Sequence, residues 1–275
     1  MARKAPFKER LTRRLSILEG RTRRTLPNAG PKHPSVYFHM PKCGGTSLSE
    51  AMYATVPFNH RIGVMDAVST RRAAAIKHFG KDDAFLCHED IEAGQLTFDM
   101  REDMLLQHMA WDTKLIHGHC LWSEKAHEYF GDTYKYVTLM RDPVARMISN
   151  FRMTQRAGLV GKDVDEYLES DIARRHAQVF LRYLYGKNDI AAEDTQTATE
   201  TAKERLSYFA LVGFLDNTDA FFASYKDIFG VTLRMAKLNA APSKKPDYTE
   251  TQLDRFRALC APDLEIFEFA KTLNP

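Results

Sequence analysis

The chain has 275 residues, of which 44% are hydrophobic and 27% are charged, a composition typical of a soluble globular protein with one large core. No apolar run approaches the roughly 18–20 residues that a membrane-spanning helix needs, and no secretory signal is expected near the start. The four cysteines are widely spaced and form no CxxC pair. This spacing argues against a zinc site or a disulfide framework and favours a reducing, cytoplasmic setting.

Most of the positive charge lies in the first 33 residues. This arm holds ten lysines and arginines against two acidic residues, a balance of +8, so the rest of the chain carries −5 of the total of +3. One interpretation is a solvated, partly disordered tail. The other is a basic amphipathic helix on an anionic membrane at its inner surface, because apolar residues are interspersed among the arginines. They are Leu11, Leu15, Ile17 and Leu18. Nucleic acid is not expected as a partner, since no aromatic residue interleaves these arginines.

After a linker rich in proline and glycine at 27–34, residues 34–275 are expected to form a single domain in which short β-rich runs alternate with helical patterns. The expected strands are 36–40, 84–87, 114–119, 136–140 and 209–214. The expected helices are 46–55, 66–79, 123–130, 144–156, 164–186, 196–207, 217–228 and 249–272, the last with a possible break at Pro262. This alternation predicts an α/β fold, with a central parallel sheet flanked by helices on both faces.

The first chemical signal is "YFHMPKCGGTSLSEAM" at 37–52, where a strand is followed by a glycine-containing loop and a helix. Backbone N–H groups at the start of such a helix, together with its dipole, favour an anion. The residues expected to contact it are Lys42, Cys43, Gly44, Gly45, Thr46 and Ser47. The lysine precedes the glycines, whereas in the Walker A pattern it follows them. The alternative is a plain glycine turn with a threonine N-cap.

A second strand, polar turn and helix occur in "YKYVTLMRDPVARMISNF" at 134–151. Arg141 stands at the strand end, where a guanidinium can hold a phosphate through two hydrogen bonds, and Ser149 lies about two helical turns further on. The alternative for Arg141 is a salt bridge with Asp142 or another carboxylate. Two such sites in one chain predict a ligand with two separated anionic groups.

Together these segments resemble sulfotransferases that use 3′-phosphoadenosine-5′-phosphosulfate (PAPS). Pro41-Lys42-x-Gly-Gly-Thr-Ser is similar to their 5′-phosphosulfate loop, and the segment from Arg141 to Ser149 is similar to their 3′-phosphate site. The resemblance runs from about residue 35 to residue 273 and includes "FALVGFLDNTDAFFASYKDIFG" at 209–230. It is closest to the Golgi-type carbohydrate sulfotransferases of the uronyl and heparan-sulfate 2-O branch. The implied fold is the P-loop-like sulfotransferase fold.

The resemblance implies transfer of a sulfuryl group from PAPS to a hydroxyl of a carbohydrate or glycolipid, without a metal. The base would be a histidine of "KLIHGHCLW" at 114–122, where His117 and His119 share one face of a strand. The 2-O branch carries a similar His-Gly-His, which implies that His119 is the base and His117 its support. Lys42 would neutralise the departing oxygen. Both histidines could instead be structural, and in that case Glu50 or Glu89 would be the base.

Further features are less specific. Lys244 or Lys245 could reach the phosphates, or their segment could be a solvated loop. His176-Ala-Gln178 departs from the Asn-x-Gln of relatives. The acceptor pocket is expected from variable loops at residues 56–66, 88–112 and 152–175. The alternatives to a sulfotransferase are a P-loop-like nucleotide kinase, which the misplaced lysine disfavours, and a non-catalytic nucleotide-binding relative. The oligomeric state stays open.

Overall fold

The computed structural model describes residues 7–234 and 248–273, except for the side chain of Glu89. Within these residues the chain forms a five-stranded sheet in the order β2-β3-β1-β4-β5, in which every neighbouring pair is parallel. The strands are β1 (Ser35–Phe38), β2 (Ile62–Met65), β3 (Leu115–Gly118), β4 (Lys135–Met140) and β5 (Leu211–Phe214). The predicted fold class is therefore confirmed.

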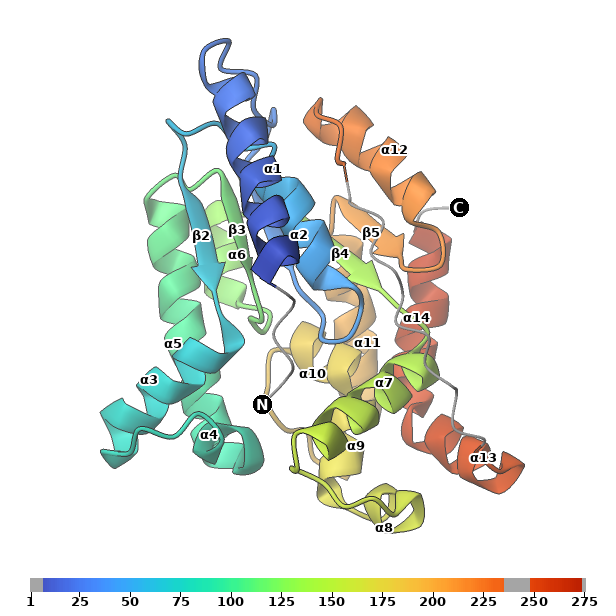
Figure 1. The fold of residues 1–275 in the computed structure, drawn as a ribbon. Coiled ribbons are helices and arrows are strands. Elements are labelled where there is room, and N and C mark those ends of the chain that lie inside the picture. Colours follow the sequence, from blue (N-terminus) through green and yellow to red (C-terminus); the bar gives the residue numbers. More distant parts are fainter. Residues whose placement is uncertain (1–6, 235–247, 274–275) are drawn as a thin grey trace.

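Helices cover both faces of the sheet because its strands are apolar on both sides (Figure 1). Tyr37 and Val137 pack on the face covered by α2 (Gly45–Tyr53) and α12 (Thr218–Phe229). Val36 and Ile116 pack on the opposite face. That face is covered by α5 (Ile91–Ala110), α6 (Glu124–Phe130), α10 (Val179–Tyr185), α11 (Thr195–Ser207) and α14 (Ala261–Leu273). This burial on both sides is typical of a parallel sheet.

Further helices gather beyond the carboxyl ends of the strands (Figure 1). One group consists of α7 (Pro143–Arg156), α8 (Val164–Leu168), α9 (Asp171–Ala177) and α13 (Glu250–Leu259), which share a hydrophobic cluster. The other consists of α3 (Ala67–Phe79) and α4 (Leu86–Glu89), which pack with α5. A 3-10 turn, η1 (Ala192–Asp194), precedes α11.

A fully buried ion pair ties these helices together. Arg146 of α7 lies with its Nη2 3.6 Å from Oδ2 of Asp263 on α14, and it donates to the carbonyl oxygen of Ala177 at 2.9 Å. Asp263 in turn accepts 2.9 Å hydrogen bonds from the backbone N–H groups of Phe180 and Leu181, at the start of α10. Arg146, in the middle of the second motif, therefore holds the fold together and does not face a ligand.

Three expectations about the elements were wrong. Residues 84–87 form no strand, because Asp83 accepts the backbone N–H of Phe85 and the chain turns into α4. The missing strand is β2, an edge strand with alternating exposure. The segment 88–112 is mostly the long helix α5 and not a loop. The expected helix 164–186 is divided into α8, α9 and α10, and Ser170 caps the middle one.

The N-terminal arm, as far as the structure describes it, is the helix α1 (Phe7–Thr25), which runs alongside α2 (Figure 1). Among the described residues, no helix has both the length and the apolar character needed to cross a bilayer. At the other end of the chain, α13 ends at Leu259 and α14 begins at Ala261, so the expected break near Pro262 is confirmed.

Candidate active site

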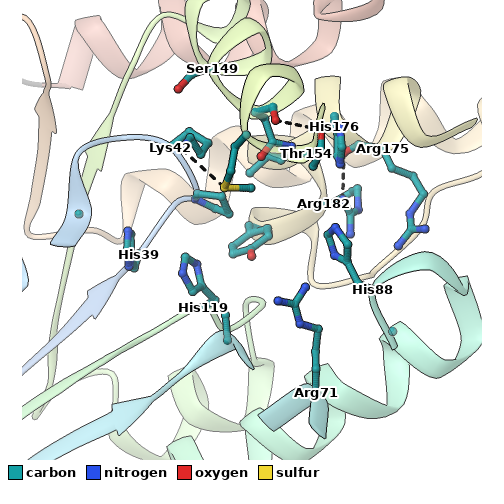
Figure 2. Close-up of a pocket in the computed structure, with 18 of the residues that line it drawn as sticks. His39, Lys42, Arg71, His88, His119, Ser149, Thr154, Arg175, His176 and Arg182 are labelled. Carbon is teal, nitrogen blue, oxygen red and sulfur yellow. Dashed lines mark hydrogen bonds between the residues drawn. The ribbon is translucent and has the colours of Figure 1, made fainter. Parts of the chain in front are cut away.

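The candidate site lies at the carboxyl ends of the three central strands. From β1 the chain enters α2 on one face of the sheet. The strands β3 and β4 lie on either side of β1. In parallel α/β sheets, ligands bind in the crevice at such a point. Here the crevice is a cavity of about 660 Å³ between the loop after β1, the helix α7 and the helices α3 to α5 (Figure 2).

The loop after β1 has the conformation of an anion site. Lys42 and Gly44 both adopt positive φ angles, of 67° and 79°, which turn the chain sharply into α2. No side chain caps the N-terminus of α2, so its first amides and its dipole are left for a ligand. Of the predicted loop residues, Lys42, Gly44, Gly45, Thr46 and Ser47 all line the cavity.

Cys43 differs from the other loop residues. Its side chain is fully buried in the hydrophobic core, and its Sγ lies 3.7 Å from the carbonyl oxygen of Pro41. Burial raises the pKa of this thiol to about 12. The side chain therefore does not line the cavity, and any contact of Cys43 with a ligand would come from its backbone.

The second predicted motif lines the same cavity. Arg141, at the end of β4, and Ser149, on α7, both face it. The Nη1 of Arg141 donates to the carbonyl oxygen of Lys42 at 3.4 Å, so the two loops are in direct contact. Desolvation lowers the pKa of Lys42, and the charges of Arg156 and Arg141 lower it further. Among the described residues that line the cavity there is no aspartate or glutamate, so this positive charge suits an anion.

Three histidine rings stand together at the ends of β1 and β3. His119 lines the cavity and stacks on His39, with ring centroids 4.2 Å apart. Behind them, Nε2 of His117 lies 3.0 Å from Nδ1 of His39, and Nδ1 of His117 lies 2.6 Å from the hydroxyl of Tyr53. His117 and His119 share one face as predicted, but the ring that accompanies His119 in the cavity is His39. His117 supports it from the layer behind.

The histidines are held in their neutral form. Burial lowers the pKa of His119 to about 3, and the neighbouring charge of Arg101 adds to this effect. Burial likewise lowers the pKa of His117 to about 4 and places that of His39 well below its usual value. Among the described residues, Nδ1 of His119 is buried without a hydrogen-bond partner. A neutral imidazole at the cavity wall has a lone pair free to accept a proton, and the negative charge of an anion bound in the cavity would raise its basicity.

Sequence reasoning missed His39, although it stands two residues before Pro41 in the first motif. Tyr37 pairs with His117 across β1 and β3, so side-chain alternation puts His39 on the same face as both other histidines. The structure also explains Gly45 in a way the motif did not. A Cβ atom at this position would lie 1.9 Å from Nε2 of His39, so the glycine makes room for that ring.

A second basic group lies across the cavity from Lys42 and Ser149 (Figure 2). It comprises Arg71 of α3, His88 of α4, Arg175 and His176 of α9, and Arg182 of α10. The Nε of Arg71 is buried and has no hydrogen-bond partner within the described part of the chain. Of the segments expected to form the acceptor pocket, 88–112 and 152–175 line the cavity and 56–66 does not. The arginines of this group give that end of the cavity a positive charge, which suits an acidic ligand.

The residues considered as alternative bases, and the lysines expected near the phosphates, are not among the described residues that line the cavity. Glu50 pairs with Arg13 at 3.3 Å and lines a smaller cavity between α1 and α2, away from the histidines. The side chain of Glu89, and both Lys244 and Lys245, lie outside the described residues.

A model of the sulfotransferase family matches residues 29–273 of the chain. This range contains both loops predicted to bind anions, the three histidines and every described residue that lines the cavity. A search of curated proteins found no significant match.

Proposed function

The chain belongs to the sulfotransferase family, and from that premise we propose that it transfers a sulfuryl group from PAPS to a hydroxyl of a carbohydrate or glycoconjugate. The family itself implies a transferase of sulfuryl groups. The donor, the acceptor and the base are our proposal. It is carried by one observation: the two loops predicted to bind anions face a single cavity whose described lining contains no carboxylate.

PAPS fits this cavity because its anionic groups are divided between two ends. The loop residues Lys42 and Thr46, with the N-terminus of α2, would hold the 5′-phosphosulfate. Arg141 and Ser149 would hold the 3′-phosphate. The direct contact between Arg141 and the backbone of Lys42 fixes the spacing of the two sites.

His119 would act as the general base. PAPS supplies the sulfuryl group, and the acceptor oxygen bonds to its sulfur while the bond to the bridging phosphate oxygen breaks. His119 takes the acceptor's proton, which requires the neutral imidazole that its surroundings maintain. Lys42 stabilises the charge that develops on the departing oxygen. His39 stacks on the ring of His119, and His39 is itself held by its hydrogen bond to His117, which is bonded in turn to Tyr53.

The acceptor would be an acidic glycan or glycolipid. Arg71 and Arg175 line the end of the cavity opposite Lys42, where a carboxylate or sulfate on the acceptor would compensate the charge of their guanidinium groups. This agrees with the resemblance of the two motifs to the uronyl and heparan-sulfate 2-O branch.

Calorimetry with three nucleotides tests the donor. Adenosine 3′,5′-bisphosphate is expected to bind well, and AMP and ATP with Mg²⁺ poorly. Arg141→Ala should remove most of the preference for the bisphosphate over AMP. Equal affinity of the wild type for AMP and the bisphosphate would contradict the roles of Arg141 and Ser149, and a preference for ATP with Mg²⁺ would indicate a kinase.

A further inference from the structure

The helix α1 packs against the body of the protein with its polar face. Gly20 lies so close to α2 that a Cβ atom there would be 2.6 Å from the carbonyl oxygen of Ala54. Arg13 pairs with Glu50, and Arg24 donates to the carbonyl oxygen of Ala54 at 3.2 Å. The contacts that hold α1 in place are thus mainly those of arginines and a glycine.

The apolar face of α1 points outward. Phe7, Leu11, Leu15 and Leu18 are 72%, 45%, 54% and 51% exposed. They are spaced by four, four and three residues and therefore form one stripe along the helix. A helix on the surface of a globular protein ordinarily turns such a stripe toward the core. The reversed orientation of α1 leaves an apolar surface that a partner outside the described fold would cover.

The charges beside the stripe indicate the kind of partner. Lys8, Arg10, Arg14 and Arg23 are exposed on α1, and Glu19 is its one exposed acidic residue. We propose that α1 lies on an anionic lipid bilayer, with the stripe at the acyl boundary and the cations among the headgroups. A second copy of the chain fits less well, because two such stripes in contact would bring their flanking cations together.

This placement would also orient the active site. α1 runs along α2, the helix that begins at the loop of the candidate site. Ser47 of α2 lines both the main cavity and the smaller one between α1 and α2. A bilayer in contact with α1 would therefore keep the cavity close to acceptors carried on lipids.

Sedimentation of the full chain with lipid vesicles tests the proposal. Wild-type protein should bind vesicles of phosphatidylcholine mixed with phosphatidylglycerol, bind poorly to phosphatidylcholine alone, and be released by salt. The double variant Leu11→Ser/Leu15→Ser should bind at least about tenfold more weakly, because it loses buried apolar area. The double variant Arg10→Glu/Arg14→Glu should bind the anionic vesicles roughly tenfold more weakly or worse, because it loses positive charge next to the headgroups.

Ile76→Ser is the matched control, since Ile76 is an exposed apolar residue of α3, outside the stripe, and its loss should leave vesicle binding unchanged. Affinity for adenosine 3′,5′-bisphosphate shows that each variant is folded. Absence of wild-type binding at low salt would overturn the proposal, as would full binding by Leu11→Ser/Leu15→Ser. A dimer in sedimentation velocity that this variant abolishes, without vesicle binding, would also overturn it and assign the stripe to a second copy.

Discussion

Mild acid should destabilise this protein strongly, because its site holds several histidines in the neutral form. Burial lowers the pKa of His119 to about 3 and those of His88 and His117 to about 4, and those of His39 and His176 also lie well below the usual value. Below pH 6.5 these histidines bind protons in the unfolded chain but stay neutral in the folded protein. Stability is therefore fully present at higher pH and is lost as the pH falls below 6.5.

The size of the effect follows from the linkage. Between pH 7 and pH 5.5, each histidine whose pKa in the folded protein is about 4 or lower removes about 1 kcal/mol of unfolding free energy. For His88, His117 and His119 together the loss is about 3 kcal/mol, and His39 and His176 add to it in the same direction. This is a large part of the roughly 5–15 kcal/mol that stabilises a typical domain.

Urea unfolding at the two pH values, followed by the fluorescence of Trp111 and Trp122, measures this loss. His119→Asn should recover about 1 kcal/mol at pH 5.5 relative to pH 7, whereas His78→Gln, at an exposed position on α3, should recover nothing. Adenosine 3′,5′-bisphosphate should reduce the loss, since its charge favours protonated imidazoles. An unfolding midpoint that stays the same from pH 7 to pH 5.5 would refute the neutral histidine cluster.

Four substitutions separate the roles of single residues. His119→Ala should lower kcat by roughly 10²–10⁴ with little change in affinity for the bisphosphate, and His117→Ala should cost less; the reverse order would exchange their roles. Gly45→Ala should displace the ring of His39 at a cost of about 1–3 kcal/mol of stability and weaken binding of the bisphosphate in calorimetry. Arg146→Ala should cost about 3–5 kcal/mol in urea unfolding, because it leaves the buried carboxylate of Asp263 unpaired; a cost below 1 kcal/mol would show that this pair does not hold the helices.

The sequence identified the parts of the site that are local in the chain. Both loops that are predicted to bind anions follow an apolar strand directly, so the change from strand to polar turn to helix was visible around Lys42 and Arg141. His39 was within reach of the same reasoning, since strand alternation relates it to Tyr37 and then to His117. It was missed because it was treated as part of the strand.

Other features depended on contacts between distant segments. The buried positions of α5 include Thr97, Arg101 and Leu105, which follow helical spacing but mix polar with apolar residues, so no apolar stripe marked the helix. Arg71 and Arg175 are about a hundred residues apart in the chain and meet only because α3 and α9 border one cavity. The orientation of α1 could not be predicted either, because an amphipathic pattern does not show which face of the helix packs against the rest of the protein.

Transfer of labelled sulfate from PAPS to a panel of acidic and neutral glycans, by the wild type and by Lys42→Ala, tests whether the cavity performs the proposed chemistry. We predict transfer to acidic glycans by the wild type, and both a lower rate and a weaker affinity for PAPS in Lys42→Ala, because in the proposed mechanism this lysine contacts the bound donor and the departing group alike. A wild-type protein that has no affinity for PAPS, or a Lys42→Ala variant with unchanged rate and affinity, would contradict the proposed function.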